Sequence, residues 1–422
     1  MSSPDQAASG VGPQSEGPSL GLLDPDRALE LVLERAPGPQ AAKRLLQNSF
    51  GARILEPILA SLPQPSFSRA LMDGFAVRIE DAGRKVTCTG EVLAGRTPGP
   101  EVEPGKAVAV MTGAPCPRGS EAVVMIEDVE RDGERLLLPR VISPGQHLQA
   151  AGSLCMPGDV ILPAGSIMTS VALAAATAAG VAEITVGRAP AVAIITTGDE
   201  LSAPDTTLGQ AQIFDSNGPM LKALAIATGA EHALLLHAAD TVESLTDALA
   251  EAANEDIVVL SGGVGVGRRD LVPGVLSALG YDKVFHKVSQ QPGMPLFFAV
   301  KGEQLAFGLP GTPLGCHLGF HRYVSAAIRK RIGLPRERPM HKGRLSTGLV
   351  TRGSRTLFRL ALVELEPGGW TITPLGWRGS SDLMGTARAN SYLRFPPGEH
   401  SFTAGQALEF ELLSGAGEAL HG

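Results

Sequence analysis

Four polar stretches of this 422-residue chain each follow an apolar run. They are "TTGDEL" (196–201), "HAAD" (237–240), "SGGVGVGRRD" (261–270) and "GLPGTP" (308–313). Carboxylates, glycine amides and a Pro-Gly turn are groups that receive phosphates or hold hard cations. If the apolar runs are parallel strands, all four loops meet on one rim of a sheet, where ligands bind in open α/β folds.

The 261–270 loop matches neither common phosphate-binding fingerprint. It lacks GxxxxGK[ST], and although Gly263 and Gly265 begin a GxG, position 268 is arginine. Its glycines still let backbone N–H groups approach an oxyanion. A flexible connection between a strand and a helix explains the same residues, so this loop alone leaves both interpretations open.

Two further stretches are ambiguous by themselves. Asp73-Gly74 in "ALMDGFAVR" (70–78) is first a hairpin turn signal. Thr112-Gly113 in "VMTGAPCPRGSEAVVMIED" (110–128) either binds a ligand or closes a turn.

Composition limits the class of protein. The chain is 44% hydrophobic but only 4% aromatic, and its length predicts two to four domains with aliphatic cores. A net charge of −7 argues against nonspecific nucleic-acid or membrane binding. The four cysteines form no CxxC or zinc spacing, no run approaches the ~18 apolar residues of a membrane span, and no signal peptide is present. We therefore expect a cytoplasmic protein with reduced thiols and no membrane partner.

The pattern of the chain predicts the elements that position these residues. A helix is expected over 24–36, with Pro25 at its first position, and short β-rich runs with Gly/Pro turns follow. From Ala191 strands alternate with helices, which predicts a mostly parallel, doubly wound sheet. Alternating runs such as "FRLALVELE" predict a C-terminal β domain.

We therefore predict a multidomain α/β plus β protein. The expected parts are a disordered tail (1–19), an N-terminal linker and helical domain (20–49 and 145–188), an inserted mostly-β domain (50–144), an α/β domain (189–332) and a C-terminal β domain (340–417).

Taken together, the motifs resemble the molybdopterin molybdenumtransferase family, which includes the E domain of gephyrin. "MDGFAVR", "MTGAPCPRGSEAVVMIED", "PAVAIITTGDEL", "QIFDSN", "SGGVGVGRRD", "GLPGTP" and "WRGSSDLMGTARANSYLRFPPG" occur in the family's order. The resemblance implies an elongated homodimer whose α/β domain binds molybdopterin, with a cleft completed by N-terminal elements of the partner subunit. It also implies insertion of molybdate into adenylylated molybdopterin, with release of AMP and a requirement for Mg²⁺.

The resemblance also carries over roles by position. It implies catalytic roles for Asp73, Thr112, Asp215, Asp270 and Lys287, and metal binding by Glu200, Asp215 and Asp270. The positions implied to bind the pterin nucleotide are Gly113, Thr197, Gly198, Ser261, Gly262, Gly263, Gly265, Pro310, Gly311, Arg359 and Ser380 (or its neighbour Ser381).

The chain departs from the family where the oxyanion is expected to dock. Gln291 and Met294 replace both lysines of the usual K-P-G-K-P, and Gly315 replaces a serine. Further departures are Leu154 in the usual Gly-Glu-Asp loop, Gly265 in place of a serine, and Ala70 ahead of Asp73. Arg268 and Arg269 are candidates to replace the lost cations, or are solvated.

Three hypotheses follow. The chain is a working molybdenumtransferase with an altered oxyanion pocket, a divergent paralogue that binds the pterin nucleotide without inserting molybdate or that uses another oxyanion such as tungstate, or a non-enzymatic scaffold. Retention of the acids favours a cleft derived from an enzyme.

Overall fold

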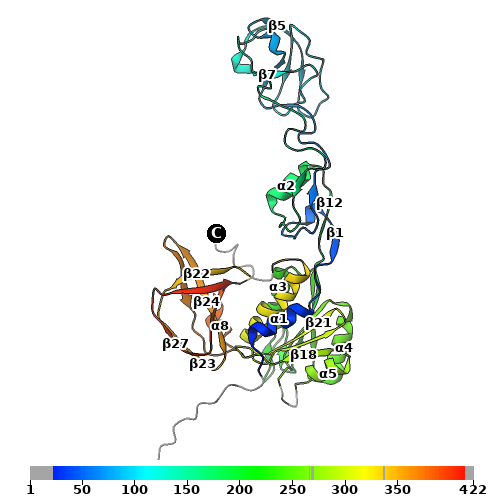
Figure 1. Cartoon of the computed structure of the whole chain (residues 1–422). Helices are drawn as coiled ribbons and strands as arrows, with labels where there is room; N and C mark the ends of the chain where they lie inside the picture. Colours follow the sequence, from blue (N-terminus) through cyan, green and yellow to red (C-terminus); the bar gives the residue numbers. More distant parts are fainter. Residues whose placement is uncertain (1–21, 266, 268–269, 336–337, 414–422) are drawn as a thin grey trace, which may run out of the picture. The chain divides into compact units, whose positions relative to one another are not determined.

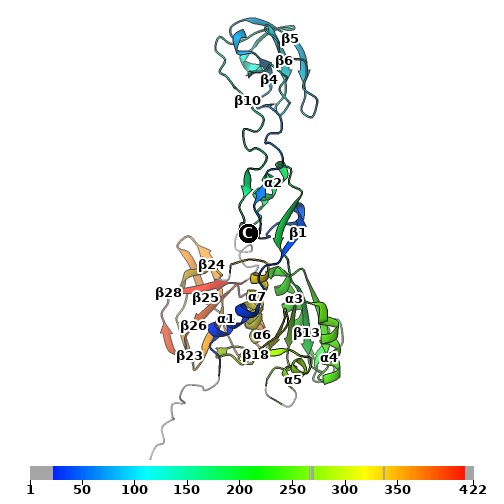
Figure 2. The same ribbon diagram turned by 45° about the vertical axis from the view of Figure 1, so that its right-hand side comes forward.

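The computed structural model describes residues 22–265, 267, 270–335 and 338–413. The chain divides into two compact units, one from Ala41 to Gly187 and one formed by the segment ending at Gln40 together with the segment starting at Arg188. Figures 1 and 2 show the elements of each unit, which we describe separately. The predicted tail (1–19) and the two loop arginines, Arg268 and Arg269, lie outside the described residues.

A six-stranded sheet forms the centre of the larger unit, in the order β16-β13-β17-β21-β20-β18. The first four strands are parallel, and the last two pair antiparallel. This confirms the mostly parallel sheet, and β18 is an edge strand that the sequence pattern did not predict. The bounds are β13 Ala191–Thr197, β16 His232–Ala238, β17 Ile257–Ser261, β18 Asp282–His286, β20 Phe297–Lys301 and β21 Gln304–Leu309.

Helices cover both faces of this sheet, as a doubly wound fold requires. One apolar core joins α1, α3 and the α6–α7 helix to one face, and another joins α4 and α5 to the opposite face (Figure 1). The bounds are α1 Pro25–Arg35, α3 Asn217–Thr228, α4 Val242–Glu251, α5 Val272–Ala278, α6 Pro313–Gly319 and α7 Ser325–Arg331. A π-helical turn, η5 (Phe320–Val324), joins α6 to α7.

Local sequence determines where these helices begin. Asp24 accepts hydrogen bonds from the backbone N–H groups of Asp26 (2.8 Å) and Arg27 (3.2 Å), and Pro25 occupies the first turn of α1. Thr241 caps α4 through the N–H of Ser244 (3.2 Å). The start of α1 was predicted from the sequence.

Helix α1 corrects one predicted domain boundary. Its buried face, which includes Ala28 and Val32, packs in the same core as α3 and α7. Residues 22–40 therefore belong with the α/β fold rather than with residues 145–188, and the unit boundary lies between Gln40 and Ala41. The apolar spacing within the helix predicts a buried face but not the surface that covers it.

The C-terminal β fold is built on the sheet β19-β24-β25-β22-β28-β26, in which β26 also pairs with β24 (Figure 2). Strand β19 comes from the α/β part of the chain, so this sheet includes a segment of the preceding domain. The bounds are β19 Gln290–Gln291, β22 Met340–Leu345, β23 Leu349–Gly353, β24 Thr356–Glu366, β25 Gly369–Pro374, α8 Leu383–Thr386, β26 Ser391–Phe395, β27 Gly398–Phe402 and β28 Ala407–Leu412.

The smaller unit contains the predicted inserted β fold, a sheet in the order β7-β4-β6-β5-β9-β8. Its strands are β4 Gly74–Val77, β5 Lys85–Val92, β6 Lys106–Val110, β7 Ala122–Met125, β8 Glu130–Asp132 and β9 Arg135–Leu137. Two-stranded pairs and one helix complete the unit: β1 Ala41–Leu45 with β12 Glu183–Gly187, β2 Ile58–Leu59 with β11 Val160–Leu162, β3 Arg69–Ala70 with β10 Leu148–Gln149, and α2 Ser170–Ala178.

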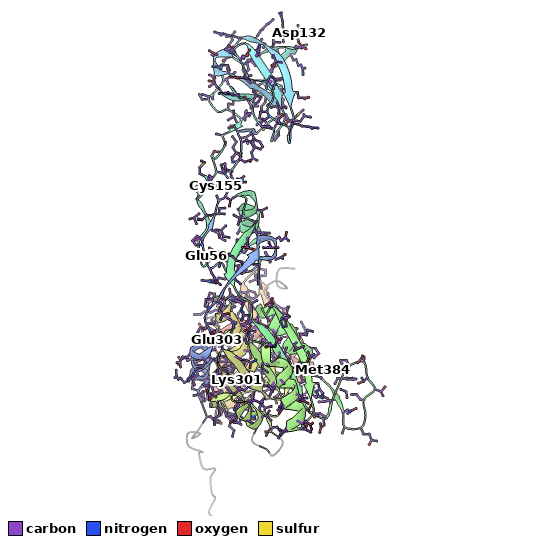
Figure 3. The ribbon with its side chains drawn as sticks, turned by 90° about the vertical axis from the view of Figure 1, so that its right-hand side faces the viewer. Glu56, Asp132, Cys155, Lys301, Glu303 and Met384 are labelled. Atoms are coloured by element: carbon purple, nitrogen blue, oxygen red, sulfur yellow. The ribbon has the colours of Figure 1, made fainter. Side chains whose placement is uncertain are left out.

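Polar side chains mark the places where the chain leaves and re-enters the larger unit. Gln40 donates to Glu303 (3.1 Å), a residue labelled in Figure 3, and accepts a hydrogen bond from Arg188 (3.2 Å). Arg188 and the buried Arg331 both bind the carboxylate of Asp256. No helix in the described part of the chain is long and apolar enough to cross a membrane.

Candidate functional site

A cavity of about 530 Å³ lies at the carboxyl ends of β17 and β21. Its walls come from four segments of the larger unit: residues 263–265 with Asp270, residues 290–295, residues 310–312, and the C-terminal residues Arg355, Trp377, Gly379 and Ser380. Of the four loops predicted to share one rim, 261–270 and 308–313 line this cavity, whereas the 196–201 and 237–240 loops do not. The contribution of the C-terminal fold was not evident from strand order.

The glycine-rich loop enters the cavity in a conformation that requires glycine. Gly262 and Gly263 have φ values of +102° and +62°. A Cβ on Gly262 would lie 2.6 Å from the hydroxyl oxygen of Thr197. The left-handed turn carries the backbone from the buried end of β17 to the cavity wall.

Asp270 ends this loop and contributes the only carboxylate among the described residues that line the cavity. Its carboxylate accepts a hydrogen bond from the N–H of Gly267. A Cβ on Gly265 would lie 2.6 Å from Oδ2 of Asp270. Glycine at position 265, where the family resemblance predicts serine, therefore leaves room for Asp270 to fold back over the loop.

The opposite wall is the segment Gln290–Pro295, which contains two of the departures from the family pattern. Gln291 and Met294 both line the cavity. Arg355 is the only cationic side chain among the described lining residues. A cavity whose charged groups are one arginine and one aspartate differs from a lysine-rich pocket, because only one positive charge balances a bound anion.

Close packing against the Pro-Gly turn explains a third departure from the family pattern, the glycine that replaces serine at position 315. A Cβ on Gly315 would lie 2.8 Å from Cγ of Pro310 and 3.0 Å from Cα of Gly293. Both neighbours line the cavity, and neither belongs to a flexible side-chain end. The 290–295 wall and the Pro-Gly turn therefore pack against each other more closely than a serine at position 315 allows.

Asn217 is a structural residue of the site that was not predicted from the sequence. Its buried amide donates to the hydroxyl of Ser261 (2.9 Å) and to the carbonyl of Gly311 (2.8 Å). One side chain thus links the glycine loop to the Pro-Gly turn. Its sequence signal is its position two residues after Asp215 in "DSNGP". The family resemblance implied a role for Asp215 only, so Asn217 was not predicted.

Ser380 lines the cavity as predicted, and its carbonyl accepts the N–H of Leu314 (3.0 Å). Its neighbours Arg355 and Trp377 also line the cavity and were not predicted. Arg355 lies in the turn between β23 and β24, where "GSRT" has no spacing that distinguishes a ligand from a solvated arginine.

Several predicted residues lie near the cavity without lining it. Ser261 is 2% exposed, and the Thr197 hydroxyl donates to its carbonyl (3.4 Å). Half-buried Lys287 has a left-handed φ of +71°, and its backbone N–H bonds to Leu296 (2.8 Å). Arg359 donates to the carbonyl of Leu375 (3.0 Å), and burial lowers its pKa. The predicted positions of the larger unit that lie outside the lining are Thr197, Gly198, Glu200, Asp215, Ser261, Gly262, Lys287 and Arg359.

The predicted three-carboxylate metal site is not formed. No group of three or more His, Cys, Asp or Glu residues in the described chain is arranged to hold a metal ion. Glu200 is exposed beyond β13, and Asp215 accepts the N–H of Gly218 (2.9 Å) at the start of α3. Asp215 lines a separate, mainly apolar cavity of about 320 Å³, whereas Asp270 lines the large one. Glu200 and Asp215 lie in the connection between β13 and α3, whereas Asp270 follows β17.

In the smaller unit, Asp73 and Thr112 form a local pair. Oδ1 of Asp73 accepts both the N–H and the hydroxyl of Thr112, each at 2.7 Å. These hydrogen bonds lower the pKa of Asp73 below its ordinary value. Gly113 follows with a φ of +80°, and both side chains of the pair are exposed. Asp73-Gly74 does not close a hairpin, because β3 pairs with β10 whereas β4 pairs with β6 and β7. Asp73 instead presents an exposed carboxylate whose orientation is fixed by Thr112.

Three family models together match nearly the whole chain. They are the "MoeA N-terminal region (domain I and II)" over residues 23–180, the "Probable molybdopterin binding domain" over 193–330, and the "MoeA C-terminal region (domain IV)" over 342–413.

Curated relatives and a solved structure agree with these models. A molybdopterin molybdenumtransferase from Staphylococcus aureus is 30% identical over 394 residues, covering 91% of this chain and 94% of the relative. One from Staphylococcus epidermidis is 31% identical over 373 residues, covering 86% and 89%. The crystal structure of a molybdopterin biosynthesis moea protein from Pyrococcus horikosii is 29% identical, with a TM-score of 0.78 over 93% of this chain and 99% of that chain.

Proposed function

Because this chain belongs to the molybdopterin molybdenumtransferase family of molybdenum cofactor biosynthesis, we propose that it inserts molybdate into adenylylated molybdopterin and releases AMP. The observation that carries the proposal is the 530 Å³ cavity. It combines a glycine-rich loop, one carboxylate, one arginine and a serine hydroxyl around a single space.

The glycine loop and the C-terminal side of the cavity have different roles in this proposal. Backbone N–H groups of the loop suit the phosphate oxygens of the nucleotide, because glycine allows close approach of the backbone. Arg355 and Ser380 suit the molybdate oxygens, since a guanidinium donates paired hydrogen bonds to an oxyanion and a hydroxyl donates a third. Trp377 supplies an apolar surface beside them.

Gln291 and Met294 alter the strength of this oxyanion site rather than remove it. An amide still donates a hydrogen bond, whereas the methionine thioether donates none. Losing two charge-assisted hydrogen bonds of about 1.5–3 kcal/mol each predicts weaker molybdate binding than a lysine-rich pocket gives. We therefore expect turnover that requires a higher molybdate concentration.

Asp270 would hold a Mg²⁺ ion, which would supply positive charge near the substrate phosphates. Mg²⁺ is usually held by one or two carboxylates together with phosphate oxygens and waters, so it does not need a cluster of three acids. The ion would neutralise charge on the pyrophosphate group. Asp270 itself contributes a hard oxygen ligand at the cavity wall, with its orientation fixed by the N–H of Gly267.

We also propose that the chain acts as a cytoplasmic homodimer. Asp73 and Thr112 belong to a unit that lacks the glycine loop, and they present an exposed carboxylate. In a homodimer that carboxylate is available to substrate bound in the partner's cavity. The family resemblance motivates this arrangement, and sedimentation of the purified protein tests the dimer.

The reaction itself is tested with purified protein, adenylylated molybdopterin, Mg²⁺ and graded molybdate. AMP release and cofactor formation should both rise with molybdate and saturate. Asp270→Ala should abolish turnover while the thermal melting curve stays that of the wild type. Nucleotide binding without molybdate-dependent AMP release would instead identify a paralogue that has lost insertion, and substitution of tungstate for molybdate tests the other oxyanion.

A further inference from the structure

Two fully buried side chains support the 290–295 wall of the cavity, and one of them belongs to its first residue. Gln290 and Tyr323 are each 0% exposed. The Tyr323 hydroxyl donates to Oε1 of Gln290 (2.6 Å), and Nε2 of Gln290 donates to the carbonyl of Gly293 (3.2 Å). A continuous set of hydrogen bonds therefore runs from the helix core to the backbone of the wall.

The backbone bonded by Gln290 shapes the cavity directly. Gln291, Gly293 and Met294 all line it. Gly293 has a φ of +83°, so the wall turns sharply at the carbonyl that Gln290 holds. The same short strand pairs Gln290 with Thr356, the residue after Arg355, so the position of the wall and the position of the cavity's arginine are linked.

Tyr323 reaches Gln290 from a π-helical turn. It lies in η5, between α6 and α7, and π turns within α-helices occur frequently at functional sites. Its neighbour Arg322 is paired with Asp26, and its guanidinium lies 5.0 Å from the ring of Phe358 and 5.8 Å from the ring of Tyr323 itself. The turn thus directs one aromatic side chain to the cavity wall and places the mostly buried guanidinium of Arg322 beside its ring.

The donor and acceptor groups of Tyr323 and Gln290 fix the direction of the two hydrogen bonds. Burial raises the pKa of Tyr323 above its ordinary value, so the phenol remains a donor. The Gln290 carbonyl oxygen accepts that hydrogen and leaves the amide free to donate to Gly293. Removing the hydroxyl leaves a buried acceptor without a partner, a change that favours movement of the amide and of the wall attached to it.

We propose that Tyr323 and Gln290 are positioning residues, which fix the Gln291–Met294 wall in the conformation that binds molybdate. This inference rests on the proposed function. It predicts an effect on molybdate rather than on the pterin nucleotide, because the glycine loop is held separately through Asn217.

A second buried tyrosine provides a matched control. Tyr392 is 4% exposed, and its hydroxyl bonds to Nδ1 of His317 (2.8 Å). It packs between α6 and the C-terminal sheet and does not line the large cavity. Tyr392→Phe therefore removes a buried hydroxyl from the same region, one whose hydrogen-bond partner is His317 rather than a residue of the wall.

The test compares Tyr323→Phe, Gln290→Met and Tyr392→Phe in the full-length protein. For the first two, the KM for molybdate should rise about tenfold, the effect of losing one buried hydrogen bond. The KM for adenylylated molybdopterin should stay within twofold of the wild type, as roughly expected for a contact made only through the molybdate wall. Tyr392→Phe should leave both constants unchanged.

The double variant Tyr323→Phe with Gln290→Met completes the test. If both residues act through one set of hydrogen bonds, the double variant should raise the molybdate KM no further than either single change. Additive effects, equal effects on both substrates, or an unchanged molybdate KM in Tyr323→Phe would each overturn the positioning role.

Direct binding separates this inference from the proposed function. Wild-type protein that binds molybdate but releases no AMP would refute the enzymatic function alone. In that case, isothermal titration with molybdate still decides the role of Tyr323: an approximately tenfold weaker Kd in Tyr323→Phe supports it, and an unchanged Kd refutes it. Absence of molybdate binding by the wild type overturns both.

Discussion

Replacing Arg355 with glutamine removes the only cation among the described residues of the cavity. The substitution keeps a polar side chain of similar length and deletes the charge. Under the proposal, the guanidinium contacts a molybdate dianion, and a hydrogen bond to a charged group contributes about 1.5–3 kcal/mol. That range corresponds to a roughly 10- to 150-fold increase in the dissociation constant.

The structure favours the lower part of this range. Arg355 is half-exposed, so water and salt screen its charge, and we expect an approximately tenfold rise in the KM for molybdate. The assay follows AMP release as molybdate is varied at two ionic strengths. The wild-type KM should increase with salt, whereas the Arg355→Gln KM should depend on salt less.

Arg352→Gln is the matched control for this experiment. Arg352 lies on the preceding strand, is paired with Glu399 at 2.7 Å, and has a side chain that is 73% exposed. Its replacement should leave the molybdate KM unchanged. An unchanged KM in Arg355→Gln, or the same rise in both variants, would refute the assignment of the oxyanion contact to Arg355.

Three further predictions follow from the same geometry. Gln291→Lys combined with Met294→Lys should lower the molybdate KM by about tenfold or more, since two cations return to the wall, and an unchanged KM would contradict the placement of the oxyanion there. Thr112→Val should raise the pKa of Asp73 toward 3.8, because the hydrogen bond from the Thr112 hydroxyl is lost, and NMR of the carboxyl group measures this change. The pKa of Asp73 is lowered in the folded state, so the ionised carboxylate stabilises the fold above pH 3.8. This contribution to the free energy of unfolding disappears as the pH falls through the lower pKa of the folded state. Gly315→Ser should lower the free energy of unfolding in urea by about 1–3 kcal/mol through overpacking, and an unchanged value would show that the wall is not closely packed.

The sequence predicted the architecture well where periodicity and turn residues act locally. Strands β13, β16, β17 and β21 follow from apolar runs that end in polar loops, and the caps of α1 and α4 follow from Asp24 and Thr241. The edge strand β18, "DKVFH", was missed because an edge strand carries a weaker apolar pattern. Helix α1 was predicted, but its partner surface depends on tertiary packing that local spacing does not encode.

The site was predicted only in part for a similar reason. Parallel strand order predicts that loops share a rim, and it placed Gly263, Asp270 and Gly311 correctly. It does not predict which side chains turn inward, and Lys287 and Arg359, whose roles came from the family resemblance alone, do not line the cavity. Arg355 was missed because its contribution depends on how the C-terminal fold packs beside β19, a long-range pairing.

Anomalous X-ray scattering from molybdenum tests the central claim most directly. Crystals of the full-length protein soaked with molybdate should show one strong anomalous peak inside the 530 Å³ cavity, within hydrogen-bond distance of Arg355 and Ser380. A peak at another site, or an empty cavity in crystals of protein that turns over molybdate in solution, would contradict the account.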